Sequence, residues 1–425
     1  MTRQGTKSKE AAGYLPLIRS NPNFRHLWFG QIVSLLGDWF NLIASATLVN
    51  RLSESGLAIS ALFVIRMLAP FLISPLAGVL ADRFNRKRLL ITADLLRAVV
   101  VICFLFVRTP SQVWLLYALT AVQLAISGVF FPTRTAILPD IVSKRNLGSA
   151  NAISSATWSI MLALGSALGG LAAGGWGVYP AFVIDSSTFL LSAFFISQIR
   201  YEKQSKSTNL SASQRSSLDQ YIDGLRYLKQ HPHVFVLTLH KAAFSLLISG
   251  PFQVVQVTIA ENIFVIGQNG GIGLGILFAT AGIGTGFGPF VARVFTQDRE
   301  RPLSIMIAIA YPLSAIGSLI IAPLSSFELV LLGNILRAVG GGITWVFSNQ
   351  LLFETVPDDI RGRVFASEFA FFSLASALGS LAGGWGVDLP QVGIGGTFLW
   401  MAGMILVPGI LWSLWLIRRG RKEER

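Results

Sequence analysis

The sequence predicts an all-α membrane protein with twelve transmembrane helices in two pseudo-symmetric six-helix bundles. Three observations support this prediction: an apolar composition, twelve long apolar segments, and a repeat that relates the two halves. Of the 425 residues, 52% are hydrophobic and 13% are charged, whereas globular domains carry about 25% charged residues. This composition excludes a protein with an ordinary water-facing surface.

The apolar segments are long enough to cross a bilayer core, which takes roughly 20 helical residues. The predicted spans are residues 27–50, 57–80, 89–107, 112–133, 147–173, 178–199, 233–260, 270–293, 303–323, 327–351, 364–386 and 395–417. The corresponding domains are a tail (1–26), a first bundle (27–199), a linker (200–232), a second bundle (233–417) and a short tail (418–425). The end of the linker has the apolar spacing of an amphipathic helix.

The positive charge predicts the orientation of the chain. The net charge is +13, and most lysines and arginines fall in the two tails and in alternate loops. On the other set of loops we find Arg51 and Arg108. This positive-inside pattern predicts a multi-pass protein of the bacterial inner membrane with both termini in the cytoplasm. We therefore expect membrane lipids, and not nucleic acid, as partners of the basic residues.

The two halves of the chain repeat each other. The segment LPDIVSKRN (138–146) is answered by VPDDIRGRV (356–364), and LAAGGWG (171–177) by LAGGWG (381–386). A duplicated six-helix unit leaves this kind of internal similarity. The repeat supports two related bundles within one chain, and we expect a monomer.

The loop after the second span resembles a known motif. The segment GVLADRFNRKR (78–88) is similar to the signature loop of the major facilitator superfamily, Gly-x-x-x-Asp-Arg/Lys-x-Gly-Arg-Arg/Lys. We expect Gly78 to allow close helix packing, and Asp82 either to cap the next helix or to face the dipole of another helix. Arg83 is expected to pair with Asp140 at a neighbouring helix end. The expected gate at this face comprises Gly78, Asp82, Arg83, Arg86, Lys87, Asp140, Arg361 and Arg363.

A small-residue motif in the fifth span resembles the antiporter signature of drug exporters in the same superfamily. Its matching positions are Gly165, Ser166, Gly169 and Gly170, with Ser166 where that signature has proline. Small residues at this spacing allow tight helix packing. The segments PDIVSKRNLGSANAISS and AFVIDSSTFLLSA further resemble the branch that contains the enterobactin exporter and the macrolide-efflux proteins. The resemblance implies the major facilitator fold and transport.

Ionisable residues at membrane depth are costly, so each is a candidate for function. Asp38 lies in the middle of the first span, one turn from Asn41. Two interpretations remain open for Asp38: proton coupling in a central cavity, or a structural bond to a neighbouring helix. Asp185, in the sixth span, has no evident partner in the sequence. The branch that the chain resembles carries an aspartate in this stretch, and the resemblance implies that Asp185 holds the fold.

Further deep charges suggest a network. Asp94 and Arg97 lie three residues apart, hence on one helix face, and Arg66 reaches a similar depth. We expect these three to form a cluster, either structural or coupling. Arg337 is expected to face an anionic substrate or an acid such as Glu368. The candidate cavity comprises Asp38, Asn41, Arg66, Asp94, Arg97, Gln123, Gln253, Gln256, Arg337 and Glu368.

Taken together, these features predict a secondary transporter that exports a hydrophobic or amphiphilic small molecule. The expected energy source is a proton gradient exchanged against that substrate, without cofactor or metal. The sequence lacks a phosphate-binding Walker loop, and its histidines have no supporting catalytic set, so we expect neither an ATP-driven pump nor an enzyme. Two alternatives remain: a facilitator of a metabolite or lipid, and a membrane sensor that does not transport.

Overall fold

The computed structural model describes residues 14–200, 217–296 and 299–423, and this part of the chain consists of helices and their connections. The first half contains α1 (Tyr14–Ser20), α2 (Pro22–Ser53), α3 (Gly56–Arg83), α4 (Arg86–Cys103), α5 (Val113–Ile141), α6 (Leu147–Gly175) and α7 (Val178–Ser197). The second contains α8 (Ser217–Gln230), α9 (Pro232–Phe244), α10 (Gly250–Thr258), α11 (Gly271–Thr296), α12 (Glu300–Ile321), α13 (Phe327–Thr355), α14 (Asp358–Asp388) and α15 (Gly393–Glu423). Twelve stretches of the described residues are long and apolar enough to cross a membrane, as predicted.

Local sequence sets where several helices begin. Asn21 caps α2 by accepting a hydrogen bond from the Phe24 backbone N–H at 3.0 Å, and Pro22 takes the first helical position. Ser55 and Asn85 cap α3 and α4 in the same way. Each cap satisfies a backbone donor that a helix start leaves unpaired.

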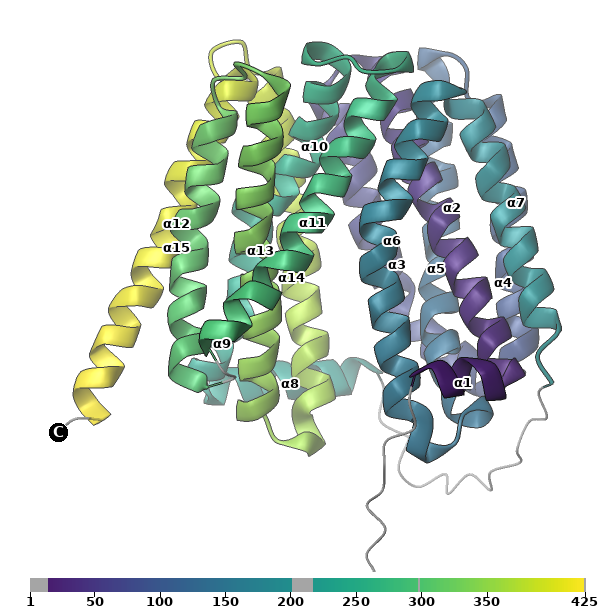
Figure 1. Cartoon of the computed structure of the whole chain (residues 1–425), viewed down its shortest axis with the longest axis horizontal. Helices are drawn as coiled ribbons and strands as arrows, with labels where there is room; N and C mark the ends of the chain where they lie inside the picture. The colour runs from purple at the N-terminus through teal and green to yellow at the C-terminus, as the bar shows by residue number, and fades with distance from the viewer. Residues whose placement is uncertain (1–13, 201–216, 297–298, 424–425) are drawn as a thin grey trace, which may run out of the picture.

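The helices form two bundles, as predicted (Figure 1). Helices α2 to α7 pack together as the first bundle, in which α2 contacts α6 and α7, and α5 contacts α3 and α4. Helices α9 to α15 form the second, in which α13 contacts α11 and α12. Helix α1 and the C-terminus lie at the same end of the molecule, which we call the terminal end, and α8 lies across the second bundle there (Figure 1).

The surface of the bundles is apolar, which fits a lipid environment. Leu72, Phe290 and Phe295 are each more than 70% exposed. Meanwhile charged side chains such as Asp94 and Arg97 are fully buried. A soluble protein rarely exposes large apolar patches, so this distribution agrees with the membrane-spanning lengths of the helices.

The seventh span is a composite helix that the sequence does not reveal. It runs from Pro232 to Ile263 and contains two π-helical turns, at Ser245–Ser249 and Ile259–Ile263, on either side of α10. A π-turn inserts an extra residue per turn, breaks the regular backbone ladder and is frequent at functional sites. Residues Gln253 and Gln256 lie in the short α-helical part between them.

Candidate functional site

The two bundles meet most closely at the end opposite the termini. A Cβ atom on Gly170 of α6 would lie 2.5 Å from the Cα atom of Gly275 on α11, so the two backbones touch. Gly165 and Gly169 of the same motif instead face Trp39 on α2, and the Ser166 hydroxyl donates to the Leu162 carbonyl at 2.6 Å. The small-residue motif therefore packs α6 against a helix of each bundle.

A second close approach joins α3 and α14. A Cβ atom on Gly384 would lie 2.3 Å from the Gly56 carbonyl oxygen. Beside it, the Ser60 hydroxyl lies 2.7 Å from the Ser380 carbonyl oxygen, to which it donates a hydrogen bond. These contacts cross between the bundles, since α3 belongs to the first and α14 to the second.

Asp388, at the end of α14, stabilises this second contact between α3 and α14. Its carboxylate accepts hydrogen bonds from the Gly56 and Leu57 backbone N–H groups, at 2.6 and 3.0 Å, and from the Ser55 hydroxyl at 2.8 Å. A carboxylate at a helix N-terminus is favoured by both the unpaired donors and the helix dipole. Asp388 and the first residues of α3 therefore form a latch between the bundles, which we call the Asp388 latch.

A polar contact between α2 and the end of the seventh span also joins the two bundles at the end of the molecule opposite the terminal end. The Asn50 amide donates to a carboxylate oxygen of Glu261 at 2.9 Å and to the Asn262 side-chain oxygen at 3.1 Å. Glu261 belongs to the second π-turn. Sequence reasoning missed both Glu261 and Asp388, because each partner lies more than 200 residues away in the chain.

Toward the terminal end the bundles separate. Helix α11 stays against α6 as far as Gly282, whose Cβ position would be 3.2 Å from Ala163. Beyond that point its glycines face its own bundle: Gly284 and Gly288 pack on α13. Figure 1 shows α11 leaning away from α6 toward the terminal end. The molecule is thus latched at one end and splayed at the other.

The first bundle buries a charged network. The Arg97 guanidinium pairs with Asp94, and the other Asp94 oxygen accepts from the Ser192 hydroxyl at 2.7 Å. The rings of Phe130 and Phe189 lie 4.2 and 4.3 Å from the guanidinium carbon. Arg97 and Asp94 are both fully buried, so the pair is shielded from water and from lipid.

The sequence predicts Arg66, Asp94 and Arg97 in one cluster, and among the described residues the direct ion pair in it is that of Arg97 and Asp94. The carboxylates within electrostatic range of Arg66 are Asp38 and Asp185. Asp38 interacts in turn with Arg97 and Arg66. Asp185, for which the sequence shows no evident partner, is fully buried and lies within electrostatic range of both arginines. Five charges thus form one cluster: three carboxylates and two arginines.

This cluster lies beside the other bundle. Trp39, the residue after Asp38, contacts Phe278 of α11 with ring centroids 5.4 Å apart. Gly37, the residue before, lets Asp185 approach: a Cβ atom there would lie 2.4 Å from its carboxylate oxygen. The middle of α2 is therefore packed between the cluster and the second bundle.

The second bundle contains a different arrangement. The Lys241 ammonium forms an ion pair with Glu368 at 2.9 Å and lies 4.4 Å from the centre of the Trp345 ring. It also donates a short hydrogen bond to the Asn349 side-chain oxygen. Of the two alternatives for Arg337, an anionic substrate or an acid such as Glu368, the second is wrong, because Glu368 on α14 pairs with Lys241 on α9.

Arg337 has no carboxylate partner among the described residues. Its guanidinium donates to the Asn334 side-chain oxygen at 2.7 Å and lies 3.6 Å from the centre of the Phe252 ring. Asn334 is itself held by the Leu277 carbonyl oxygen at 2.7 Å. Arg337 is 5% exposed, so it is a buried cation without a carboxylate counter-ion in the described part of the chain.

The candidate cavity residues are not equally accessible. In this conformation Asn41, Asp94, Arg97, Gln123, Gln256, Arg337 and Glu368 are buried, whereas Asp38, Arg66 and Gln253 are partly exposed. They therefore do not line one open cavity together, as the sequence suggested. The side-chain oxygens of Gln123 and Gln256 have no hydrogen-bond partner in the described part of the chain, and unsatisfied buried groups of this kind call for an explanation.

The signature loop is organised by Arg86. Its guanidinium donates to the Asp140 carboxylate and to the Ala136 carbonyl oxygen, both at 2.8 Å. Arg83, predicted to make the Asp140 pair, is exposed, because it ends α3 while Arg86 begins α4 beside the end of α5. Asn85 caps α4. Gly78 and Asp82 lie in the last turns of α3. Lys87 is half-buried.

The counterpart residues in the second bundle act locally. Arg361 donates to the Phe353 carbonyl oxygen at 2.9 Å and to the Val356 carbonyl oxygen at 3.0 Å, at the end of α13. Arg363 forms an ion pair with Asp223 of α8 at 3.2 Å. The linker helix is therefore attached to the second bundle.

The chain matches the sequence profile of the Major Facilitator Superfamily over residues 27–311 and 268–425. It is 26% identical to the uncharacterised MFS-type transporter YfiS of Bacillus subtilis, over 93% of this chain and 94% of that protein. It is 26% identical to a putative bacilysin exporter, BacE, of Bacillus subtilis (85% and 88% of the two chains). Macrolide efflux protein A of Streptococcus pyogenes is 22% identical (90% and 93%).

Solved structures agree on the fold. The nucleoside transporter NupG superposes with a TM-score of 0.72 at 12% identity, over 92% of this chain and 98% of that chain. The described residues contain twelve helices long and apolar enough to span a membrane, and the family match covers nearly the whole sequence, so the chain belongs to the major facilitator superfamily of membrane transporters.

Proposed function

We propose that this transporter exports an amphiphilic small molecule by alternating access, in exchange for protons. The observation that carries the proposal is the charge imbalance in the first bundle, where three carboxylates face two arginines. An uncompensated charge at membrane depth costs several kcal/mol. One bound proton removes the excess negative charge. Asp38 is the half-buried carboxylate of the three, so it is the one that a proton from solvent reaches first.

The orientation follows from the basic residues. Arg86, Lys87 and Arg88 lie at the terminal end, as do the arginines of the last turns of α15. By the positive-inside rule this end faces the cytoplasm of a bacterial cell. The observed conformation is then open toward the cytoplasm and latched toward the outside, ready to accept a substrate from the cytoplasm.

The substrate class is supported by the relatives and by the residues of the second bundle. One relative is called a putative bacilysin exporter and another a macrolide efflux protein, and we infer the same direction of transport here. Arg337 offers a cation and Phe252 an aromatic face, a combination suited to a molecule with an apolar body and a polar or acidic group.

The cycle requires the two ends to open in turn. Substrate enters while the bundles are splayed at the terminal end and displaces the proton held at the Asp38 cluster. Opening of the outside then requires the Asp388 latch and the Asn50–Glu261 contact to break. One chain supplies both bundles, so we propose a monomer that works without a cofactor.

The test is transport into inverted vesicles, whose cytoplasmic face points outward. Wild-type protein is expected to accumulate a labelled macrolide when the vesicle interior is acidic and to lose this uptake when a protonophore is added. Asp38→Asn is expected to lower gradient-driven uptake at least tenfold while exchange of labelled for unlabelled substrate continues. Exchange shows that the variant is folded and binds its substrate.

The matched control is Glu54→Gln, since Glu54 is an exposed acid just past the end of the same helix. Its uptake should equal that of the wild type. If uptake of every compound tested ignores the gradient and Asp38→Asn changes nothing, proton coupling is ruled out. Passive facilitation would then be the better description.

A further inference from the structure

Glu261, in the contact between the bundles opposite the terminal end, is a carboxylate without a cation bound to it. Its Oε2 atom accepts a hydrogen bond from the Asn50 amide at 2.9 Å. The residue as a whole is half-buried, but its Oε1 atom is buried and has no hydrogen-bond partner in the described part of the chain. The charged form of such a carboxylate is costly, because neither water nor a cation compensates that oxygen.

Few charged groups face Glu261. The π-turn that carries it packs against α10, α11 and the short turn Gln268–Gly270, and α2 approaches it through Asn50. Helix α10 and the short turn contain no ionisable residue, and the arginine of α11 lies in its last turn, at the far end. Helix α2 supplies Arg51. Arg51 is exposed and donates to the Tyr179 hydroxyl at 3.4 Å, so it attracts Glu261 only through space.

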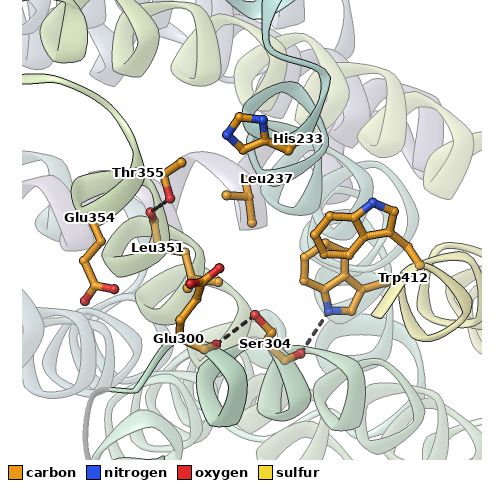
Figure 2. A pocket seen from close by; sticks show the side chains of 9 residues that line it. His233, Leu237, Glu300, Ser304, Leu351, Glu354, Thr355 and Trp412 are labelled. Atoms are coloured by element: carbon orange, nitrogen blue, oxygen red, sulfur yellow. Dashed lines mark hydrogen bonds between the residues drawn. The ribbon is translucent and has the colours of Figure 1, made fainter. Parts of the chain in front are cut away.

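Three other carboxylates of the second bundle are paired or exposed. Glu368 forms its ion pair with Lys241. Glu300 and Glu354 are exposed and lie in the wall of a cavity of about 490 Å³ near the terminal end (Figure 2). Glu354 also accepts a hydrogen bond from the Gln350 amide at 3.3 Å. These side chains have a cation, water or a donor beside them, whereas the Oε1 atom of Glu261 has none of these.

Thr47 of α2 supplies the partner that a protonated Glu261 needs. Its side chain lies beside the Glu261 carboxylate and is fully buried, and its hydroxyl oxygen has no hydrogen-bond partner in the described part of the chain. A carboxylate only accepts hydrogen bonds, whereas a carboxylic acid has one O–H donor. A proton on Oε1 therefore gives the Thr47 oxygen a donor and leaves Oε2 to accept from Asn50.

The burial of Glu261 depends on the contact between the bundles. Thr47 and Asn50 belong to the first bundle, and so does α6, which lies against the loop after the π-turn. A Cβ atom on Gly267 of that loop would lie 2.9 Å from the Gly174 carbonyl oxygen of α6, and one on Gly270 would meet the Ala260 carbonyl oxygen. When the bundles part at this end, these neighbours leave and water reaches the carboxylate.

We propose that Glu261 is a proton-binding site facing the outer medium, occupied when the outside is closed and empty when it is open. In the closed state the proton removes a buried charge. In the open state water solvates the carboxylate, and the charged form is favoured. A proton taken from an acidic outer medium therefore favours closure of the outside, and its loss at higher pH favours opening.

This inference rests on the alternating access proposed above, but not on the binding of a proton at Asp38. After the substrate leaves, an acidic outer medium would return the transporter to the state that is open to the cytoplasm. The same gradient that drives exchange at Asp38 would thus also set the outer contact.

The test is electron–electron double resonance on the full-length protein in detergent. Spin labels are placed at Ser111 and Ser325, exposed residues of the first and second bundles at the end opposite the termini. The background carries Cys103→Ser and also Asp38→Asn, which removes the coupling carboxylate of the proposed cycle. We expect the ratio of closed to open molecules to rise about tenfold from about pH 8.5 to about pH 5.5, because only the closed state retains the proton in this range.

Glu261→Gln keeps the size of the side chain and its contact with Asn50 but cannot ionise. We expect it to stay closed at both pH values, with a ratio that changes less than about twofold, since no proton is exchanged. The matched control is Glu328→Gln, an exposed acid in the first turn of α13 at the same end. It should keep the full response to pH.

Thr47→Val removes the hydroxyl oxygen at nearly constant volume. We expect the midpoint of the titration to move to lower pH by about 0.5–1 pH units, the effect of one neutral hydrogen bond. Ser53→Ala is the control on the same helix, since the Ser53 hydroxyl donates to the Val49 carbonyl oxygen, and it should leave the midpoint unchanged. This shift decides the question if Glu261→Gln does not fold.

A response to pH that survives in Glu261→Gln overturns the proposal, and so does a distance distribution that ignores pH while Glu261 is present. The titration is repeated with sodium replaced by choline. A response to sodium at constant pH would assign the carboxylate to an alkali cation, and the proton site would be rejected. Because the background lacks Asp38, a failure of proton coupling in vesicles leaves these outcomes unchanged, and the two proposals fail separately.

Discussion

The two bundles share one architecture but bury charge of opposite sign. Deep in the first bundle three carboxylates are set against two arginines. Deep in the second, Lys241 and Arg337 are set against Glu368. A duplicated unit has thus diverged in its interior: the first half has one carboxylate in excess and the second one cation in excess. In the proposed cycle the first would hold a proton and the second an anionic group.

The largest effect is expected for Arg97→Met, which removes the cation at the centre of the first bundle. Asp94 would remain as a buried charge without its ion-pair partner, and such changes cost about 3–5 kcal/mol. Thermal unfolding in detergent, followed by tryptophan fluorescence, measures the loss. Adding Asp94→Asn should restore at least half of the stability, because the unpaired charge disappears.

Arg88→Met is the control for that experiment, since Arg88 is exposed at the start of α4. It should unfold like the wild type. If Arg97→Met unfolds at the same temperature as the wild type, the Asp94–Arg97 pair does not stabilise the first bundle. The negative charge of Asp94 must then be compensated by another group.

The second largest effect is expected for the Asp388 latch, which joins α14 of the second bundle to α3 of the first. Asp388→Asn weakens three hydrogen bonds to a charged acceptor, each worth about 1.5–3 kcal/mol. Even the loss of one such bond would shift the population toward the outside-open state about tenfold. Spin labels at Glu54 and Gln391, in a background with Cys103→Ser, should report a longer distance for a larger fraction of molecules.

Glu328→Gln, an exposed acid at the same end, is the control and should leave the distance distribution unchanged. An unchanged distribution in Asp388→Asn as well would mean that the glycine contacts between α6 and α11 alone keep the outside closed.

The smallest effect is expected for Arg337→Gln, which removes the excess cation of the second bundle. For a substrate with an acidic group we expect KM to rise about tenfold, equivalent to about 1.4 kcal/mol, while a neutral substrate changes less than twofold. Transport assays with a matched acid and its methyl ester make the comparison. Arg108→Gln, at an exposed position, is the control. Equal losses for both substrates would assign Arg337 to packing against Phe252 instead.

The sequence predicts the fold because the bilayer sets the length of each apolar segment. All twelve predicted spans overlap those observed. The ends differ, since helices continue into the polar boundary: the first span, predicted to begin at residue 27, begins at Pro22. The π-turns around α10 could not be predicted, because their extra residue leaves no mark in the apolar pattern.

The candidate site is less predictable because its pairs depend on helix rotation. Asp94 and Arg97 were found from their spacing, which fixes a common face. The partner of Asp140 was assigned to Arg83 and proved to be Arg86, three residues on. The pair of Lys241 and Glu368 spans two distant helices, and nothing in the local sequence indicates that those faces meet.

The Asp388 latch has a consequence for how the protein tolerates change. Two of its three donors are backbone N–H groups, which every residue except proline supplies. Side chains at positions 56 and 57 can therefore vary on this account, provided that α3 still begins there and no bulk enters between Gly56 and Gly384. Asp388 would consequently show little covariation with any single partner across homologues, and methods that infer contacts from correlated substitutions would overlook a residue that joins the two bundles.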